Sequence, residues 1–259
     1  MIGIFDSGMG GLTVAMAIRE RAPLADFVYF ADLANMPFGE KSEEELLHIT
    51  KHAIQFLMDH GATEIVAACN SVSMLASGLR SEIHIPIMEM SEPTVCALAQ
   101  DHPQPLLVKE ESLPSILVVA TEATVRSGMY ARAFAAQGIK IESMAIPVLA
   151  SAIERDASRM ELREIILPAV KYAITMNAKT LVLGCTQYPF ARSLFEEMFF
   201  EQNYFIEVFD PADAVAEEVV SQFDVRGRGE QTFFVSKSSE VFDRSVREFF
   251  SSKSLISIP

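Results

Sequence analysis

Short apolar runs rich in β-branched residues alternate with longer helical patterns along the whole chain, and this alternation strongly constrains the fold. Most of the runs are apolar at every position, which is typical of strands buried on both faces of a parallel sheet. The predicted strands are 2–6, 27–32, 64–70, 86–89, 115–121, 140–146, 180–186, 205–210 and 231–236. Strands joined by helices in this way predict an α/β fold with right-handed crossovers.

Three helices are predicted from end signals or apolar spacing. The clearest begins after Ser42, because Ser42 and Glu45 form a capping box that satisfies free backbone N–H groups. A second helix is predicted over 212–223 and a third over 159–177. Pro168 in the third predicts either a kink or a junction between two helices.

The stretch 101–114, DHPQPLLVKEESLP, is the most irregular part of the chain and predicts a loop or linker. A domain boundary is expected near it, and a second near 200–208. With 259 residues the chain is long enough for two domains, each with its own core.

Charge and composition exclude several classes of protein. A net charge of −14 argues against binding nucleic acid or anionic lipid through the surface as a whole. No long apolar stretch is present and the first residues lack the features of a signal peptide, so we expect no membrane segment and a cytoplasmic location.

Polar residues follow many of the predicted strands, at the edge where open α/β sheets bind ligands. They are Asp6, Ser7, Asp32, Cys69, Asn70, Ser71, Thr121, Cys185, Thr186, Gln187 and Asp210. Two of the three cysteines are among them, within similar segments, IVAACNS (65–71) and LVLGCTQ (181–187). A free cysteine is usually a small core residue. Two at equivalent strand ends favour reactive thiols, with nearby helix N-termini able to hold a carboxylate.

No cofactor or metal is predicted. The glycine turn over 6–11 matches neither the P-loop nor the dinucleotide motif, and predicts a tight turn that a small anion can approach closely. His48 and His52 are four residues apart, without a third metal ligand in evidence. No lysine lies at the end of a predicted strand, which argues against pyridoxal phosphate.

The sequence resembles the cofactor-independent aspartate/glutamate racemase family, and glutamate racemases in particular. The resemblance rests on IGIFDSGMGGLTV at the start, NMPFGEKS (35–42), AACNSVS around Cys69, VVATEATVRSGMY (118–130) and GCTQYP (184–189). DPADAVA (210–216) and FFVSKSSEVFDRSVREFF (233–250) are similar to the closing helix and final hairpin-like stretch of the family. The motifs occur in the order of the family and cover nearly the whole chain.

The resemblance implies two similar α/β domains with mainly parallel sheets, related by a pseudo-twofold axis, and an active site in the cleft between them. The first domain would hold residues 1–97 plus 208–259, and the second 98–207. The implied activity is interconversion of L- and D-glutamate by two cysteines, supplying D-glutamate for peptidoglycan. A homodimer is also compatible with the family.

The resemblance assigns roles residue by residue. Cys69 and Cys185 are the implied catalytic thiols, assisted by Asp6 and Glu154. The implied substrate-binding residues are Asp6, Ser7, Phe38, Gly39, Asn70, Ser71, Thr121, Thr124, Thr186 and Gln187. Asp32 is expected to be structural.

Three departures from the family pattern bear on activity: Phe38 replaces a tyrosine, Ser71 replaces a threonine, and Gln187 replaces a histidine beside the second cysteine. Glutamine cannot carry a proton at neutral pH, so the third departure is the most consequential. Three readings stay open: a glutamate racemase, another enzyme of the wider racemase superfamily, and an acidic-amino-acid binding relative without turnover.

Overall fold

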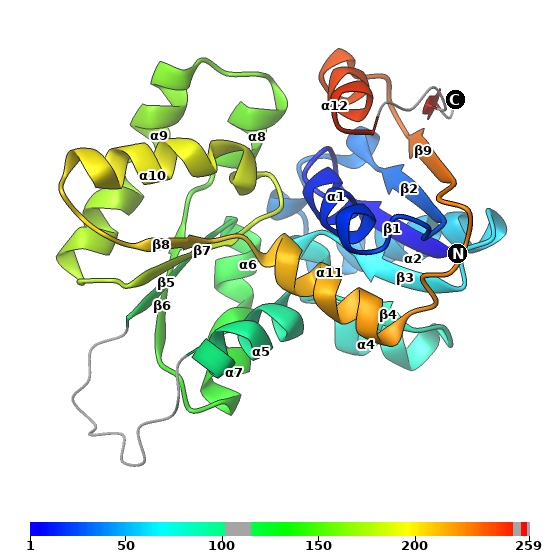
Figure 1. The fold of residues 1–259 in the computed structure, drawn as a ribbon, viewed down its shortest axis with the longest axis horizontal. Helices are drawn as coiled ribbons and strands as arrows, with labels where there is room; N and C mark the ends of the chain where they lie inside the picture. The colour runs from blue at the N-terminus through cyan, green and yellow to red at the C-terminus, as the bar shows by residue number, and fades with distance from the viewer. Residues whose placement is uncertain (102–114, 251–254, 258–259) are drawn as a thin grey trace. The chain divides into compact units, whose positions relative to one another are not determined.

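The computed structural model describes residues 1–101, 115–250 and 255–257 (Figure 1). The strands are β1 Ile2–Asp6, β2 Phe27–Ala31, β3 Glu64–Ala67, β4 Ile87–Met88, β5 Ile116–Ala120, β6 Ile141–Ala145, β7 Thr180–Gly184, β8 Glu207–Phe209, β9 Gln231–Val235 and β10 Leu255–Ser257. The α-helices are α1 Leu12–Arg21, α2 Glu43–Asp59, α3 Asn70–Ser73, α4 Ala76–Glu82, α5 Ser91–Asp101, α6 Glu122–Ser127, α7 Met129–Ala136, α8 Leu149–Glu154, α9 Arg159–Thr175, α10 Arg192–Glu201, α11 Pro211–Gln222 and α12 Glu240–Phe250. Short 3-10 helices are η1 Leu33–Asn35, η2 Phe38–Glu40 and η3 Tyr188–Ala191.

Two parallel sheets confirm the predicted α/β class. One has the order β10-β9-β2-β1-β3-β4 and the other the order β6-β5-β7-β8. The second order repeats the four strands β2-β1-β3-β4 of the first, strand for strand. β5 therefore corresponds to β1, and β7 corresponds to β3. This repeat makes the ends of β3 and β7 equivalent positions in the two sheets.

The chain divides into two compact units, one of Met1–Met90 with Ala212–Pro259 and one of Ser91–Pro211. The boundaries expected from the sequence, 97/98 and 207/208, fall inside α5 and β8. Both elements lie entirely within the second unit. The loop predicted for 101–114 lies outside the described residues except for Asp101, which ends α5.

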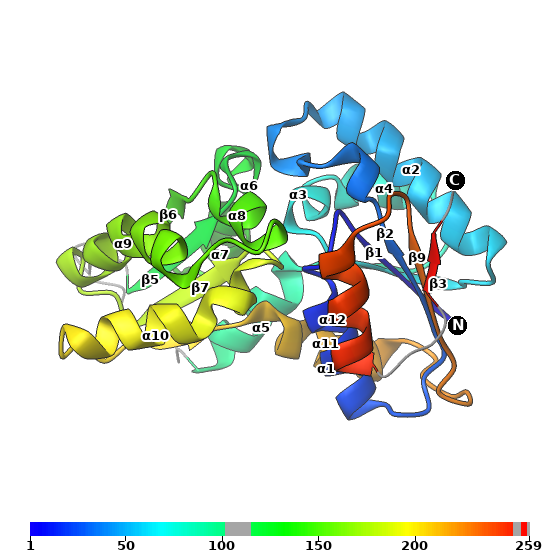
Figure 2. The same ribbon diagram turned by 90° about the horizontal axis from the view of Figure 1, so that it is seen from above.

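In the first unit, helices cover both faces of the sheet, as Figure 2 shows for α2 on one side and α1 and α12 on the other. Alternate residues of β2 explain the two layers. Val28 and Phe30 belong to the core beneath α2, whereas the Tyr29 ring lies 6.0 Å from that of Phe242 in α12. The strand is apolar throughout because both of its faces are buried.

The second unit is layered in the same way (Figure 1). α8, α9 and α10 lie on one side of its sheet, and α5, α6 and α7 lie on the other. Every residue of β5 and β7 is buried, as the continuous apolar runs predict. The core of each unit therefore holds the carboxyl ends of its own strands in place.

One prediction about local structure needs correction, and one open alternative is decided. The stretch 233–250 is not hairpin-like but contains the end of β9 and then α12, whose Phe242, Val246 and Phe250 are buried at helical spacing. β10, which pairs with β9 in parallel, was not predicted.

For α9 the sequence left open a kink or a junction between two helices. The structure shows one continuous helix with Pro168 inside it. Its buried face, which includes Ile166 and Ala169, spans the proline and offsets the cost of the lost backbone hydrogen bond.

Candidate active site

The glycine turn after β1 is organised by the Asp6 carboxylate. Asp6 is fully buried, and its Oδ2 accepts the N–H groups of Gly8 (3.1 Å) and Gly11 (2.9 Å). The Tyr29 hydroxyl donates to the Gly8 carbonyl at 2.8 Å. A Cβ at Gly11 would lie 2.7 Å from Asp6 Cβ and 2.8 Å from Tyr29 Oη, so only glycine fits without displacement. The turn is thus a packed, hydrogen-bonded structure rather than a plain loop.

Cys69 lies two residues beyond the end of β3 and faces this turn. Its side chain is buried, and its Sγ donates to Ser7 Oγ at 3.7 Å. Burial, followed by the negative charge of Asp6, raises the pKa of Cys69 from 9.0 to about 12. The hydrogen bond to Ser7 and the backbone N–H groups of Val72 and Ser71 oppose that rise. The resting side chain is therefore a thiol at neutral pH.

The residues after Cys69 are held firmly. Asn70 and Ser71 begin α3 and are both buried. Ser73 Oγ donates to the Cys69 carbonyl (3.2 Å) and accepts the N–H of Met90 (3.1 Å), which ties the cysteine backbone to the residue two positions beyond β4. The thiol therefore projects from a backbone fixed on two sides.

Phe38, nominated by the resemblance, is a core residue. Its ring is 3% exposed and lies 6.0 Å from that of Phe5. A ring directed into the core explains why phenylalanine is accommodated here. Only the backbone of Phe38 and the half-buried Gly39 remain as candidates for contact with a substrate.

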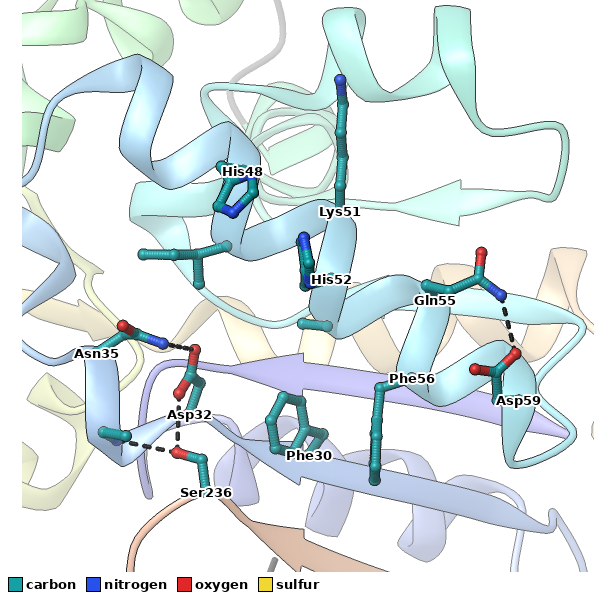
Figure 3. A pocket seen from close by; sticks show the side chains of 13 residues that line it. Phe30, Asp32, Asn35, His48, Lys51, His52, Gln55, Phe56, Asp59 and Ser236 are labelled. Atoms are coloured by element: carbon teal, nitrogen blue, oxygen red, sulfur yellow. Dashed lines mark hydrogen bonds between the residues drawn. The ribbon is translucent and has the colours of Figure 1, made fainter. Parts of the chain in front are cut away.

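Asp32 holds a loop rather than a ligand. Its two carboxylate oxygens accept the Ser236 hydroxyl and the Asn35 side-chain amide, each at 2.8 Å, and Ser236 Oγ accepts the N–H of Ala34 at 2.9 Å (Figure 3). This network joins η1 to the end of β9, in line with the structural role expected from the sequence.

A cavity of about 960 Å³ lies between that network and α2, with Phe30 and Phe56 among its lining residues. His48 and His52 stand on its α2 side, their rings 4.5 Å apart. Neither Cys69 nor Cys185 lines this cavity. Within the described ranges, no group of three residues is arranged to hold a metal ion.

In the second unit, Cys185 follows β7 directly and begins a chain of hydrogen bonds. Cys185 Sγ donates to Gln187 Oε1 at 3.3 Å, and Gln187 Nε2 donates to Glu154 Oε2 at 3.2 Å. Glu154 is the last residue of α8 and lies 31 positions before Cys185, whereas Gln187 lies 2 positions after it. The structure brings these three residues together. Glu154 was nominated by the family resemblance alone, and the structure places its carboxylate beside the Gln187 amide.

Tyr188 fixes the segment that carries Gln187. Its buried hydroxyl donates to the Ile146 carbonyl at 2.8 Å, and burial raises its pKa well above the ordinary value. Thr186, between the cysteine and the glutamine, is 4% exposed. The whole 185–188 segment is therefore buried and well ordered by its partners.

The end of β5 carries two hydroxyls. Thr121 caps α6, since its Oγ1 accepts the N–H of Thr124 at 3.3 Å, and the two Oγ1 atoms are 3.0 Å apart. Because β5 corresponds to β1, Thr121 occupies the position that Ser7 occupies in the first unit, and Ala120 that of Asp6. Asp210, the remaining strand-end candidate, is half-buried between β8 and α11.

Tyr29 and Glu89 are buried and were not among the sequence candidates. Tyr29, in the middle of an apolar strand, gave no signal because its partner is the Gly8 carbonyl 21 residues away. Glu89 follows β4 and is 3% exposed. Its position at the end of a predicted strand was the signal that could have found it.

The two units together define the class of the protein: α/β sheets with the same strand order, each presenting a buried cysteine just past the equivalent strand. A thiol is thus placed at the edge of each sheet where open α/β folds bind their ligands. Among the described helices, none has both the length and the apolar character needed to cross a membrane.

Comparison with known proteins identifies the family. Residues 13–219 match the Asp/Glu/Hydantoin racemase family. A glutamate racemase of Desulforudis audaxviator is 32% identical over 269 residues, covering 96% of this chain and 93% of the relative. One of Aquifex aeolicus is 30% identical, covering 95% and 92%. The solved glutamate racemase of Aquifex pyrophilus superposes with a TM-score of 0.80 at 29% identity, covering 99% of this chain and 97% of that one.

The chain therefore belongs to the Asp/Glu/Hydantoin racemase family. As such it is an amino-acid racemase, an isomerase, and the family resemblance seen in its motifs is confirmed.

Proposed function

We propose that this chain is a glutamate racemase that works without a cofactor and uses Cys69 and Cys185 as its two acid–base groups. The observation that carries the proposal is the equivalence of β3 and β7, each followed by a buried cysteine. Its relatives at about 30% identity over nearly their full length are named glutamate racemases, which supports glutamate as substrate.

Two thiols suit the reaction because inversion at the α-carbon uses both of its faces. One group must remove a proton from one face while another delivers a proton to the opposite face. A single base would have to turn the substrate between the two steps. With two cysteines, a thiolate takes the proton, a thiol on the other side gives one, and their roles are then exchanged for the next turnover.

The α-proton of an amino acid is only weakly acidic, so the site must stabilise the negative charge that develops. In our proposal, N–H and hydroxyl groups at the strand ends surround the α-carboxylate and do this electrostatically. Ser7, Asn70 and Ser71 would act from the first unit, and Thr121, Thr124 and Thr186 from the second. Phe38 and Gly39 would contribute their backbones.

Asp6 would bind the substrate ammonium group. Burial first, and then the charge of Asp6, raise the pKa of Cys69. A bound cation would cancel part of the second contribution and so favour the thiolate when substrate is present. The thiol would thus be activated by the substrate on which it acts.

Gln187 bears on rate rather than on the class of reaction. If the family histidine assists proton transfer, its replacement would slow turnover by about 10²–10⁴-fold, the usual contribution of such a group. The two enantiomers have equal free energy in water, so kcat/KM must fall equally in both directions.

Incubation of the purified chain with L- and D-glutamate in D₂O tests the proposal. We expect inversion of each enantiomer together with incorporation of deuterium at the α-carbon. Absence of both at high enzyme concentration would refute glutamate racemisation. Exchange with aspartate alone would assign another substrate within the same family.

Cysteine variants test the two thiols. Cys69→Ser and Cys185→Ser are each expected to abolish inversion, because either change leaves one face without a proton carrier. Cys96→Ser is the matched control, since Cys96 is exposed on α5 and should leave the rate unchanged. Full turnover by either of the first two variants would remove that cysteine from the mechanism.

We further propose a cytoplasmic role in supplying D-glutamate for peptidoglycan, supported by the need to keep both thiols reduced. The chain is also proposed to form a homodimer, as the family resemblance suggests. Analytical ultracentrifugation of the purified protein tests this, with a single species of monomer mass, 28.6 kDa, as the contrary result.

A further inference from the structure

We propose that Glu154 fixes the direction of the Gln187 side-chain amide and, through it, holds Cys185 in its protonated form. Glu154 and Gln187 are then positioning residues that act on the thiol. The inference deepens the proposed function, on which it rests for the role of Cys185 in proton transfer.

The hydrogen-bond chemistry of the three side chains carries the argument. An ionised carboxylate can only accept hydrogen bonds, so Gln187 must turn its Nε2 toward Glu154, where the distance is 3.2 Å. Its Oε1 is then left facing Cys185 Sγ at 3.3 Å. An amide oxygen accepts from an S–H group but repels a thiolate. The arrangement therefore favours the thiol over the thiolate.

Burial makes this preference effective. Gln187 is 3% exposed and Cys185 is 5% exposed, so water cannot readily take over either bond. A buried polar group without a partner is costly, and electrostatic effects are larger where solvent is excluded. The amide thus transmits the charge state of Glu154 to the sulfur.

Formation of the Cys185 thiolate then requires a specific rearrangement. If the amide turns so that Nε2 donates to the thiolate, Oε1 faces Glu154 and needs a donor there. Glu154 can supply one only after taking up a proton. Loss of the proton from Cys185 is therefore coupled to gain of a proton at Glu154.

Such an amide differs from the histidine that the family carries at this position. An imidazole can hold a proton of its own, whereas glutamine can only reverse its donor and acceptor ends. The replacement consequently moves the proton-accepting role from position 187 to Glu154.

Several ionisable groups on the elements packed around this chain of bonds are paired with one another or with the backbone. Tyr188 of η3 donates to the Ile146 carbonyl, and Arg155, just after α8, pairs with Glu161 of α9. Arg192 of α10 pairs with Glu196. On the facing sides of α9 and α10, Arg159 and Arg163 pair with Glu197 and Glu201. Glu154 is the one carboxylate bonded to Gln187 among the described interactions.

The test measures alkylation of Cys185 by iodoacetamide between about pH 6 and 9, with each cysteine-containing peptide quantified by mass spectrometry. Glu154→Gln should raise the Cys185 rate at pH 7 about tenfold, the effect of reversing one hydrogen bond to a charged group. The Cys69 and Cys96 peptides of the same digests serve as internal controls and should react as in the parent.

The Gln187→Met background distinguishes two ways in which Glu154 could affect the Cys185 rate. One is an effect carried by the Gln187 amide, and the other is the charge of Glu154 acting through space. Gln187→Met keeps the side-chain length but removes both amide groups, and by itself should raise the Cys185 rate because the facing oxygen is gone. In that background Glu154→Gln should change the rate by less than about threefold. An equal effect of Glu154→Gln in both backgrounds, or no effect in either, would overturn the proposal.

The experiment contains no substrate, so it is independent of the proposed function. Coupled thiol reactivity without racemisation would leave the inference standing and refute the activity. Racemisation without that coupling of thiol reactivity to Glu154 would refute the inference and leave the proposed activity standing. If Glu154→Gln does not fold, the rise in rate with Gln187→Met decides the outcome, and an unchanged rate refutes the inference.

Discussion

At the scale of single residues, the two cysteines have contrasting surroundings. Cys69 lies beside the buried carboxylate of Asp6 and donates to a hydroxyl, whereas Cys185 donates to an amide oxygen that is itself tied to a carboxylate. Burial and Asp6 favour the thiol at Cys69, and our proposal assigns the same form to Cys185. The resting enzyme is therefore expected to hold both sulfurs protonated, and substrate must supply the change that releases one proton.

The raised pKa of Cys69 predicts a loss of stability at alkaline pH. Because the folded-state pKa of about 12 lies above the ordinary value of 9.0, its stabilising contribution is complete below pH 9 and is lost as the pH rises toward 12. Cys69→Ser removes this contribution. Its free energy of unfolding should fall less between about pH 8 and 10.5 than that of the parent, as measured by urea unfolding.

Cys96→Ser is the control for that comparison, because its side chain is exposed and should leave the alkaline loss as it is in the parent. Tyr188 also has a raised pKa from burial and contributes over the same range in all three proteins. Equal losses in the parent and in Cys69→Ser would contradict the assignment.

At the scale of elements, continuous apolar runs predicted the strands well, and the capping box at Ser42 predicted the start of α2. The hairpin-like stretch implied by the resemblance was wrong for α12, where Phe242, Val246 and Phe250 are buried at helical spacing. β10 was missed because its place depends on pairing with β9 rather than on a strong run of its own.

The turn between β1 and α1 yields a prediction for Gly11→Ala. The added Cβ would lie 2.7 Å from Asp6 Cβ, 2.8 Å from Tyr29 Oη and 3.2 Å from Ala68 Cβ, so Asp6 must move. We expect a loss of about 1–3 kcal/mol in the free energy of unfolding, together with a reduced rate of racemisation.

Gly78→Ala is the matched control. Gly78 lies within α4, and a Cβ there meets nothing within 4 Å, so alanine should stabilise the helix by about 0.5–1 kcal/mol. Chemical denaturation measures both variants. A Gly11→Ala protein as stable and active as the parent would show that the turn tolerates displacement of Asp6.

At the scale of the whole molecule, the two units share the strand order β2-β1-β3-β4 and β6-β5-β7-β8 and have separate cores. Separate cores predict that damage to one unit stays largely within it. Phe195→Ala, at a fully buried site of α10 in the second unit, should cost about 3–5 kcal/mol and reduce hydrogen-exchange protection mainly within 91–211.

Phe242→Ala in α12 is the complementary variant, since Phe242 is equally buried in the first unit. It should reduce protection mainly in 1–90 and 212–250. Loss of protection throughout the chain in both variants would mean that the two units unfold as one, and would contradict the proposed domain division.

The sequence by itself determined the α/β class, the family and the candidate residues Cys69, Cys185 and Asp6. These depend on local information: apolar runs of strand length and the residue types that follow them. Tertiary structure alone decided which distant groups meet. The bond of Tyr29 to the Gly8 carbonyl and that of Gln187 to Glu154 link positions whose separation no local pattern encodes. Packing also kept α9 continuous through Pro168, because burial of a whole helical face outweighs one missing hydrogen bond.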